Sequence, residues 1–385
     1  MIPYSRQSIS KEDIETVVKV LKSDFLTQGK EVPAFEESVC EYTGSKFALA
    51  VNSATSGLHI ACLALGLGSE DILWTSPITF VASANCGLYC GAKVDFVDID
   101  PLTWNISIEK LELKLKKAKI ENSLPKILVA VHLCGLSCDM KSINILSKKY
   151  GFKVIEDASH AIGGRFKKNR IGNCVYSNAT IFSFHAIKGI TTGEGGMVLT
   201  NNQDLATQVQ LLRNHGISRE KSLMTHTPDG PWYYQQIALG FNYRMTDIQG
   251  ALGRSQLKRL DSFISRRHEI ASIYDDLLAE LPLKFQYNSI DSYSGMHLYV
   301  VRVNSDKLIK TRKEIFEFLR MKNIGVNVHY IPVHLQPFYK QLGFREGQYP
   351  EAESYYREAI SLPVYPDLKK QDLNKVVKAL RLALK

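Results

Sequence analysis

IFSFHAIKGITTGEGG, residues 181–196, places a single lysine between an aromatic-rich apolar segment and a glycine-rich turn. The apolar segment predicts a buried strand over 179–184, and Lys188 follows that strand directly. Burial at such a place removes water from an amine and lowers its pKa, and a neutral amine can form a Schiff base with a carbonyl. Gly193, Gly195 and Gly196 permit an unusual backbone path close to the lysine. A solvated lysine before an ordinary turn is the alternative reading.

Two upstream segments share the pattern of a strand followed by small or polar residues. Residues 153–157, KVIED, predict a short strand that ends in the carboxylate of Asp157, at the strand end where ligands of open α/β sheets bind. Residues 47–52 predict another strand, and the hydroxyl-rich turn over 53–56 leads into an amphipathic helix. The free N–H groups and positive dipole end of that helix favour a phosphate. A phosphate site, a carboxylate and a nucleophilic lysine, in this order, are the protein groups that pyridoxal phosphate requires.

Strand and helix patterns alternate from about residue 46 to 210, which predicts an α/β fold with a mostly parallel central sheet and helices on both faces. The expected strands are 47–52, 72–75, 94–97, 127–131, 154–156, 179–184 and 197–200, and the expected helices are 57–65, 108–118, 140–149 and 205–214.

A long helical pattern through 266–281 marks the expected change of domain. We expect a large cofactor-binding domain over 1–260, which includes the N-terminal segment, and a small C-terminal α+β domain over 261–385. In the small domain the pattern predicts strands over 297–303 and 325–330 and a helix over 311–321. Residues 225–232 are expected to form an exposed loop.

The composition and charge indicate a globular protein and argue against membrane and nucleic-acid-binding proteins. The chain has 385 residues, 45% hydrophobic and 23% charged, which is typical of a soluble globular protein. It has no apolar stretch near the eighteen residues of a membrane span and no basic, then apolar, opening segment, so we expect a cytoplasmic protein without membrane contact. The formal charge of +9 is spread along the chain rather than gathered into a stripe, which argues against nucleic-acid binding.

The seven cysteines are an odd number set mostly in apolar or helical patterns, which indicates reduced thiols. Cys86 and Cys90, like Cys134 and Cys138, are separated by three residues. That spacing is wider than in zinc ribbons and fingers, so no metal site is expected.

Five separated motifs carry a resemblance to a known family over essentially the whole chain. They are residues 2–4, IPY; 24–29, DFLTQG; the central segments 48–59, 153–163 and 181–196; 240–245, GFNYRM; and 328–332, VHYIP. With these motifs the chain resembles the fold-type I, pyridoxal-phosphate-dependent sugar aminotransferases of the DegT/DnrJ/EryC1/StrS group.

The resemblance implies a nucleotide-sugar substrate, L-glutamate as amino donor and a homodimer with shared active sites. Residues 4–9, 26–29, 159–161 and 184–188 are most similar to members that aminate C4 of a UDP-linked 4-keto-6-deoxy-N-acetylhexosamine in pseudaminic acid biosynthesis. Two alternatives stay open. One is amination of another dTDP-, GDP- or UDP-linked keto sugar, and the other is a non-catalytic sensor with the same fold.

The resemblance also implies residue roles. Lys188 is implied to be the catalytic lysine that holds the cofactor, and Asp157 to pair with the pyridinium nitrogen. The phosphate is implied to lie against Ala54, Thr55 and Ser56. The other implied cofactor contacts are Phe80, His160, Ser183 and, from the second subunit, Asn242; the implied substrate contacts are Tyr4, Leu26, Thr27, Arg244, His329 and Tyr330.

Each role has a structural alternative, such as a helix cap for Asp157 or a core ring for Phe80, and two positions leave a specific choice. His160 stands where many relatives carry glutamine, and it either bonds the cofactor's 3′ oxygen or lines the pocket. Arg244 either meets a phosphate or carboxylate of the substrate or forms a structural ion pair.

Overall fold

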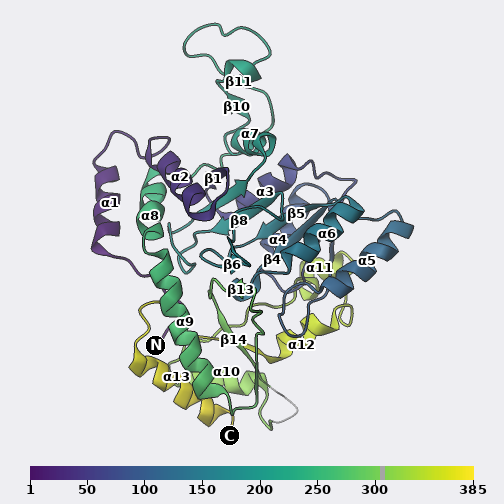
Figure 1. Ribbon diagram of the computed structural model, residues 1–385, viewed down its shortest axis with the longest axis vertical. Coiled ribbons are helices and arrows are strands. Elements are labelled where there is room, and N and C mark those ends of the chain that lie inside the picture. Colours follow the sequence, from purple (N-terminus) through teal and green to yellow (C-terminus); the bar gives the residue numbers. More distant parts are fainter. Residues whose placement is uncertain (304–307) are drawn as a thin grey trace.

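A seven-stranded sheet organises the molecule in the computed structural model, which describes residues 1–303 and 308–385 (Figure 1). Its order is β1 (Phe47–Val51), β9 (Gly196–Thr200), β8 (Ala179–Ser183), β5 (Lys153–Asp157), β4 (Ile127–Val131), β2 (Ile72–Thr75) and β3 (Lys93–Phe96). The strands from β8 to β3 pair in parallel, and β9 pairs antiparallel with both β8 and β1. The predicted mostly parallel sheet is confirmed.

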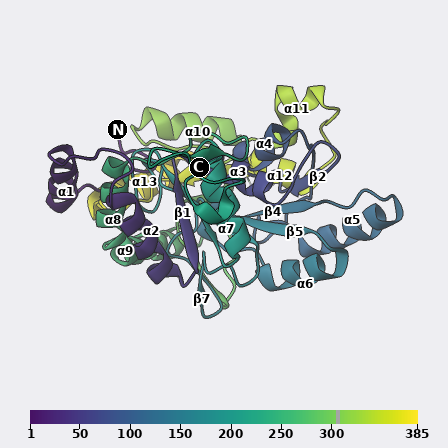
Figure 2. The same cartoon turned by 90° about the horizontal axis from the view of Figure 1, so that it is seen from above.

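Side-chain alternation along the strands explains why helices cover both faces (Figure 2). In β4, Ile127, Val129 and Val131 belong to the core beneath α3 (Ala54–Ala64), whereas Leu128 and Ala130 face the core of the opposite side. The helices of the first face are α3, α4 (Ala82–Tyr89) and α7 (Gln203–Leu212), and those of the other are α5 (Ile108–Ile120), α6 (Met140–Tyr150), α2 (Glu31–Thr43) and α8 (Asp247–Leu257). Strand β4, ILVAV, is buried at every residue, as expected for a sheet covered on both faces.

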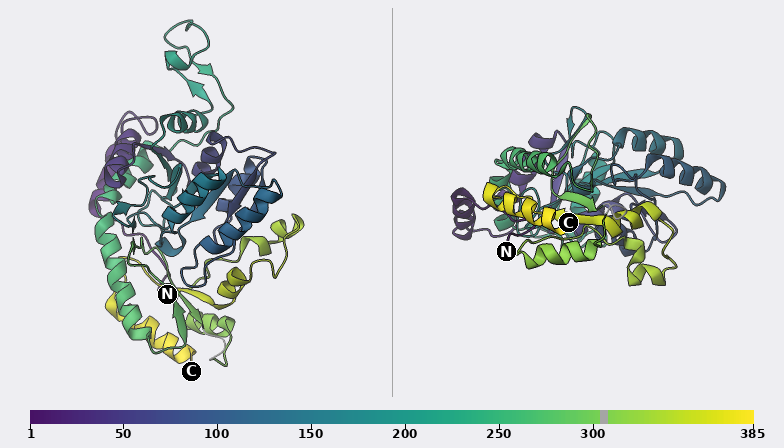
Figure 3. Two further views of the ribbon diagram at one scale, coloured as in Figure 1. Left: turned by 45° about the vertical axis from the view of Figure 1, so that its right-hand side comes forward. Right: turned by 90° about the horizontal axis from the view of Figure 1, so that it is seen from below.

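The C-terminal part is built on a second, three-stranded antiparallel sheet. Its strands are β12 (Leu283–Phe285), β14 (Tyr299–Val303) and β15 (Ala359–Leu362). The helices around it are α9 (Leu260–Leu278), α10 (Arg312–Met321), α12 (Pro350–Glu358) and α13 (Lys370–Ala383). The short α11 (Pro337–Gln341) packs instead against the large sheet through Tyr339, and α1 (Lys11–Leu21) packs on α8. Figure 3 shows α9 running from the large sheet down to the C-terminal helices.

The division at 260/261 stays a prediction, because the packing crosses it. Leu298, Val300 and Tyr355 belong to the same buried cluster as the strands of the large sheet. A separate cluster joins α9, α10, α13 and β14. The C-terminal part therefore has a core of its own and also contributes side chains to the core of the first.

The predicted strand over 325–330 is wrong. Among the described residues, this segment makes one isolated bridge, of Asn327 with Ser361, and Ile324 just before it bridges Ile2. The backbone leaves the sheet after Asn327 and carries His329 and Tyr330 toward a cavity, where the Tyr355 hydroxyl donates to the carbonyl of His329. The alternating pattern of the segment reflects one side buried in the cavity wall rather than a regular ladder.

A hairpin arm projects from the large sheet at the top of Figure 1. It is formed by β10 (Ile217–Ser218) and β11 (Gln235–Gln236), and its tip contains the predicted exposed loop. Trp232 is 69% exposed on this arm. A third small sheet consists of β13 (Ser292–Tyr293), β6 (Arg165–Phe166) and β7 (Asn169–Arg170).

No helix in residues 1–303 and 308–385 is both long and apolar enough to cross a membrane.

Candidate active site

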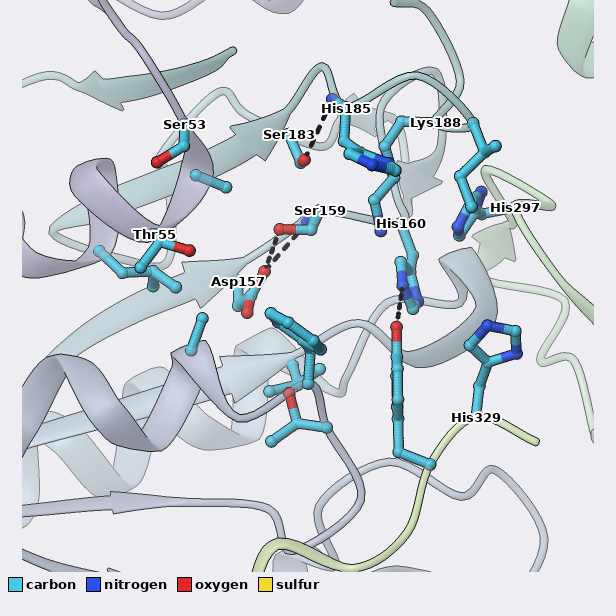
Figure 4. A pocket seen from close by; sticks show the side chains of 18 of the residues that line it. Ser53, Thr55, Asp157, Ser159, His160, Ser183, His185, Lys188, His297 and His329 are labelled. Atoms are coloured by element: carbon cyan, nitrogen blue, oxygen red, sulfur yellow. Dashed lines mark hydrogen bonds between the residues drawn. The ribbon is translucent and has the colours of Figure 1, made fainter. Parts of the chain in front are cut away.

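A cavity of about 540 Å³ lies at the carboxyl ends of the parallel strands, between the large sheet and the C-terminal part (Figure 4). Val131 ends β4, Asp157 ends β5 and Ser183 ends β8, and all three line the cavity. The opposite wall comes from 327–330 and His297. Strand ends of an α/β sheet are where ligands of this fold class bind, so the topology itself brings these groups together.

Lys188 reaches the cavity from the turn after β8. Burial lowers the pKa of its amine from the ordinary 10.5 to about 8, and the Asp157 carboxylate opposes this shift. Its backbone N–H donates to the carbonyl of His185, which fixes the turn. A lysine in this state keeps a substantial neutral fraction near pH 7 to 8 and can act as a nucleophile and as a base.

Asp157 is 7% exposed and fully engaged by hydroxyls. The Ser83 hydroxyl donates to Oδ2 at 2.5 Å, and the hydroxyl and N–H of Ser159 both donate to Oδ1, at 2.6 and 3.1 Å. The carboxylate is therefore held in one orientation at the floor of the cavity.

Helix α3 points its N-terminus at the cavity, and Ser53, Ala54 and Thr55 line it. Ser53 is the N-cap, and its hydroxyl accepts the N–H of Ser56 at 3.1 Å. The N–H groups of the first helical turn have no intrahelical acceptor, so those of Ala54 and Thr55 remain for an anion. Gly196 makes this arrangement possible, because a Cβ there would lie 2.5 Å from the backbone of residues 53 and 54.

Histidines and a tyrosine form the wall opposite the strand ends. The His160 Nε2 atom and the Tyr330 hydroxyl are 3.0 Å apart, and the His160 and His297 ring centroids are 4.4 Å apart. Burial, reinforced by the charge of Lys188, holds the pKa of His160 and of His297 well below 6.5 and lowers that of His329 to about 4. This wall is uncharged.

The structure brings most of the expected site residues to this cavity. Those that line it are Tyr4, Ala54, Thr55, Phe80, Asp157, His160, Ser183, Lys188, His329 and Tyr330. Their individual roles stay predictions, which the geometry of one cavity supports.

Five expected residues do not line the cavity of their own chain. The Ser56 hydroxyl donates instead to Asn52 Oδ1 at 2.5 Å, and the lining hydroxyl at the start of α3 is that of Ser53. Leu26, Thr27 and Asn242 are also absent from the lining residues. Arg244 lines a different cavity, of about 870 Å³, at the base of the hairpin arm, where its Nη1 donates to Asn214 Oδ1 at 2.6 Å. The alternative of an ion pair for Arg244 is not what the structure has, since this partner is an amide.

Several lining residues were not among the predicted site residues, and two of them, Ser159 and His297, contact other residues of the site. Ser159 follows Asp157 by two residues, and this Asp-x-Ser spacing is the signal that could have identified it. His297 begins a run that the pattern assigns to a strand, and no local signal separates it from a core histidine. His297 reaches the cavity because residues 294–298 pack between the loops that follow β4 and β5. Gly135 and Gly295 allow the close backbone contact at this place.

The donor set of the cavity fits pyridoxal phosphate. The free N–H groups at the start of α3 suit the phosphate, the fixed Asp157 carboxylate suits a protonated ring nitrogen, and the Lys188 amine suits the aldehyde. Phe80, 58% exposed, offers an aromatic face in the same cavity. Residues 1–303 and 308–385 contain no group of three or more His, Cys, Asp or Glu side chains arranged to hold a metal ion.

Comparisons with known sequences identify the family of the chain. The DegT/DnrJ/EryC1/StrS aminotransferase family model matches residues 7–381. The chain is 40% identical to the UDP-4-amino-4,6-dideoxy-N-acetyl-beta-L-altrosamine transaminase of Campylobacter jejuni, over 97% of this chain and 94% of that protein. It is also 40% identical to the spore coat polysaccharide biosynthesis protein SpsC of Bacillus subtilis, over 99% and 96%.

Solved structures give the same result. Helicobacter pylori PseC, an aminotransferase involved in the biosynthesis of pseudoaminic acid, superposes with a TM-score of 0.91 at 33% identity, over 100% of this chain and 99% of that one. The putative sugar aminotransferase Spr1654 of Streptococcus pneumoniae matches in its pyridoxal-phosphate form with a TM-score of 0.88 at 26% identity, over 99% and 98%. The chain therefore belongs to the DegT/DnrJ/EryC1/StrS aminotransferase family and is a pyridoxal-phosphate-dependent sugar aminotransferase.

Proposed function

We propose that the protein transfers the amino group of L-glutamate to C4 of a UDP-linked 4-keto-6-deoxy-N-acetylhexosamine, UDP-2-acetamido-2,6-dideoxy-β-L-arabino-hex-4-ulose, in pseudaminic acid biosynthesis. The observation that carries the chemistry is the cavity in which Lys188, Asp157 and the start of α3 meet. The choice of sugar is supported by likeness to the Campylobacter transaminase and to PseC.

Asp157, Lys188 and the start of α3 have different roles in the proposed reaction. When bound, pyridoxal phosphate supplies an aldehyde that takes the amino group and a ring that takes up the electron pair of a broken C–H bond. Asp157, oriented by Ser83 and Ser159, would pair with the ring nitrogen of the bound cofactor and favour its protonated state. The Lys188 Nζ atom, once free, takes a proton from one carbon and returns it to another, because its lowered pKa leaves the neutral form accessible. The free amide groups at the start of α3 would bind the phosphate and keep the ring in place.

A homodimer with shared sites is part of the proposal. Lys188 is the only lysine among the described lining residues of the cavity, which include no arginine, and the wall opposite it is uncharged. Yet glutamate carries two carboxylates and the nucleotide sugar a diphosphate, which require cations or N–H donors. Arg244 and Asn242, outside the cavity of their own chain, would supply such groups to the site of a second copy.

Two other functions remain testable alternatives. One is amination of a different nucleotide-linked keto sugar, which stays open because the chain is equally identical to SpsC, a protein named for spore coat polysaccharide biosynthesis. The other is a non-catalytic sensor with this fold, which would bind the cofactor without turnover. Absorbance spectra distinguish the two, because glutamate bleaches the visible absorbance of a transaminase but not that of a sensor.

A substrate panel tests the proposal. The purified protein is incubated with glutamate and UDP-, dTDP- or GDP-linked 4-keto sugars, and mass spectrometry follows the exchange of the ketone oxygen for an amine. The UDP-4-keto-6-deoxy-N-acetylhexosamine of arabino configuration should be converted fastest, and Lys188→Ala should convert none. Faster conversion of another nucleotide sugar would replace the proposed substrate and leave the family assignment intact.

A further inference from the structure

The two ring nitrogens of His160 have different surroundings. Nε2 lies 3.0 Å from the Tyr330 hydroxyl. Nδ1 is buried and has no hydrogen-bond partner among the described residues. The His297 ring, itself buried, lies against the His160 ring, at 4.4 Å between centroids. His160 therefore has one nitrogen already bonded, as the dashed line at its ring in Figure 4 shows, and the other closed off from solvent.

This environment limits what His160 can do for a ligand. His160 has no uncommitted nitrogen that is open to the cavity, because Tyr330 takes Nε2 and Nδ1 is enclosed. The Tyr330 hydroxyl, in contrast, belongs to a residue that lines the cavity and uses only one of its hydrogen-bonding positions on His160.

The enclosed Nδ1 atom also favours one tautomer. If the ring proton were on Nδ1, a buried N–H would lack an acceptor, which native structures rarely contain. If the proton is on Nε2, only a lone pair is unpaired, and Nε2–H donates to the Tyr330 oxygen. The phenolic proton of Tyr330 is then free to point into the cavity. Burial raises the pKa of Tyr330, so this proton stays on the oxygen.

We propose that Tyr330, positioned by His160, donates a hydrogen bond to an acceptor oxygen of the ligand in the Lys188 cavity, and that His160 acts on the reaction only through Tyr330. The acceptor is an oxygen that carries or gains negative charge: either the ring oxygen of the bound cofactor or an oxygen of the reacting substrate. His160 is a positioning residue in this arrangement. The kinetic part of this inference rests on the proposed function, whereas the tautomer does not.

The first test reads the tautomer without turnover. Nitrogen-15 spectra of histidine-labelled protein are recorded without cofactor, and the His160 signals are assigned by their loss in His160→Gln. The expected result is a proton on Nε2 and none on Nδ1, with a shift of the Nε2 signal in Tyr330→Phe. A proton on Nδ1, or an Nε2 signal indifferent to Tyr330→Phe, would overturn the inference even in a fully active enzyme.

The second test is a double-mutant cycle in the holoenzyme. Tyr330→Phe should slow the transfer of the amino group from glutamate by about tenfold to a hundredfold, the loss expected for one charge-assisted hydrogen bond. His160→Leu should lose a similar factor, and His160→Gln, which keeps an N–H donor, should recover most of it. The double variant Tyr330→Phe with His160→Leu should be no slower than Tyr330→Phe alone. Losses that multiply would show that His160 acts independently.

The resting absorbance spectrum identifies the acceptor. If Tyr330→Phe shifts the visible band or its pH titration, the acceptor is the cofactor's ring oxygen; if the band is unchanged and only the rates fall, the acceptor belongs to the substrate. Unchanged band and unchanged rates together would overturn the proposal. Tyr293→Phe is the matched control, because Tyr293 also contacts a histidine ring but lies outside the cavity lining, and it should alter neither.

Discussion

The lowered pKa of Lys188 predicts the pH dependence of cofactor capture. Only the neutral amine attacks the aldehyde, so capture is lost as the pH falls through the pKa of the lysine in the folded protein. With that pKa at about 8, about one amine in ten is neutral at pH 7. A lysine at the ordinary 10.5 would be neutral in about three molecules in ten thousand, so burial contributes a factor of about 300 at this pH.

The assay is stopped-flow absorbance of the cofactor-stripped protein mixed with pyridoxal phosphate from pH 6 to pH 10.5. The capture rate is divided by that of a model lysine amide at the same pH, which removes the ionisation of the cofactor itself. The ratio should be largest below pH 8 and fall about tenfold per unit above it. Lys188→Ala should show no capture phase. A ratio independent of pH, or a protein rate that climbs to pH 10 without levelling, would refute the reasoning about burial.

Three further predictions follow from individual contacts. Ser83→Ala removes a hydroxyl that donates to buried Asp157, and it should lower the unfolding free energy of the cofactor-free protein by about 1–3 kcal/mol in urea titrations; a change below about 0.5 kcal/mol would mean that the bond is replaced. Gly196→Ala places a methyl group 2.5 Å from the backbone at the start of α3 and should weaken cofactor binding at least tenfold by equilibrium dialysis, an expectation that fails if affinity is retained. Arg244→Ala and Lys188→Ala should each be inactive alone. Refolded together, they should regain about a quarter of the wild-type activity, because half of the dimers are hybrids with one intact site; no recovery would contradict sharing.

The strands of the large sheet could be predicted because each buried strand is a short apolar run in the sequence. Residues 72–75 and 127–131 coincide with β2 and β4, since both are short apolar runs buried on both faces. Lys188 and Asp157 could be predicted as site residues for the same reason. Lys188 follows such a run and Asp157 ends one, and the carboxyl ends of parallel strands lie at one edge of the sheet.

Other features depend on tertiary packing that no local pattern records. The segment 325–330 alternates like a strand, but its neighbour offers only Ser361 as a pairing partner, so the chain turns into the cavity. Helix α1 was not predicted, although Ser10 and Asp13 form a capping box that could have signalled it. His297 could not be found, because its place beside His160 depends on how the C-terminal part docks against the large sheet.

Covalent trapping of the cofactor tests the central claim most directly. Borohydride reduces a double bond between a lysine and an aldehyde to a stable secondary amine, which survives proteolysis and mass spectrometry. The protein as purified, after reduction, should yield the peptide that contains Lys188 with the added mass of a phosphopyridoxyl group, and its visible absorbance should vanish. An unmodified Lys188 peptide, or the added mass on another lysine, would contradict the account.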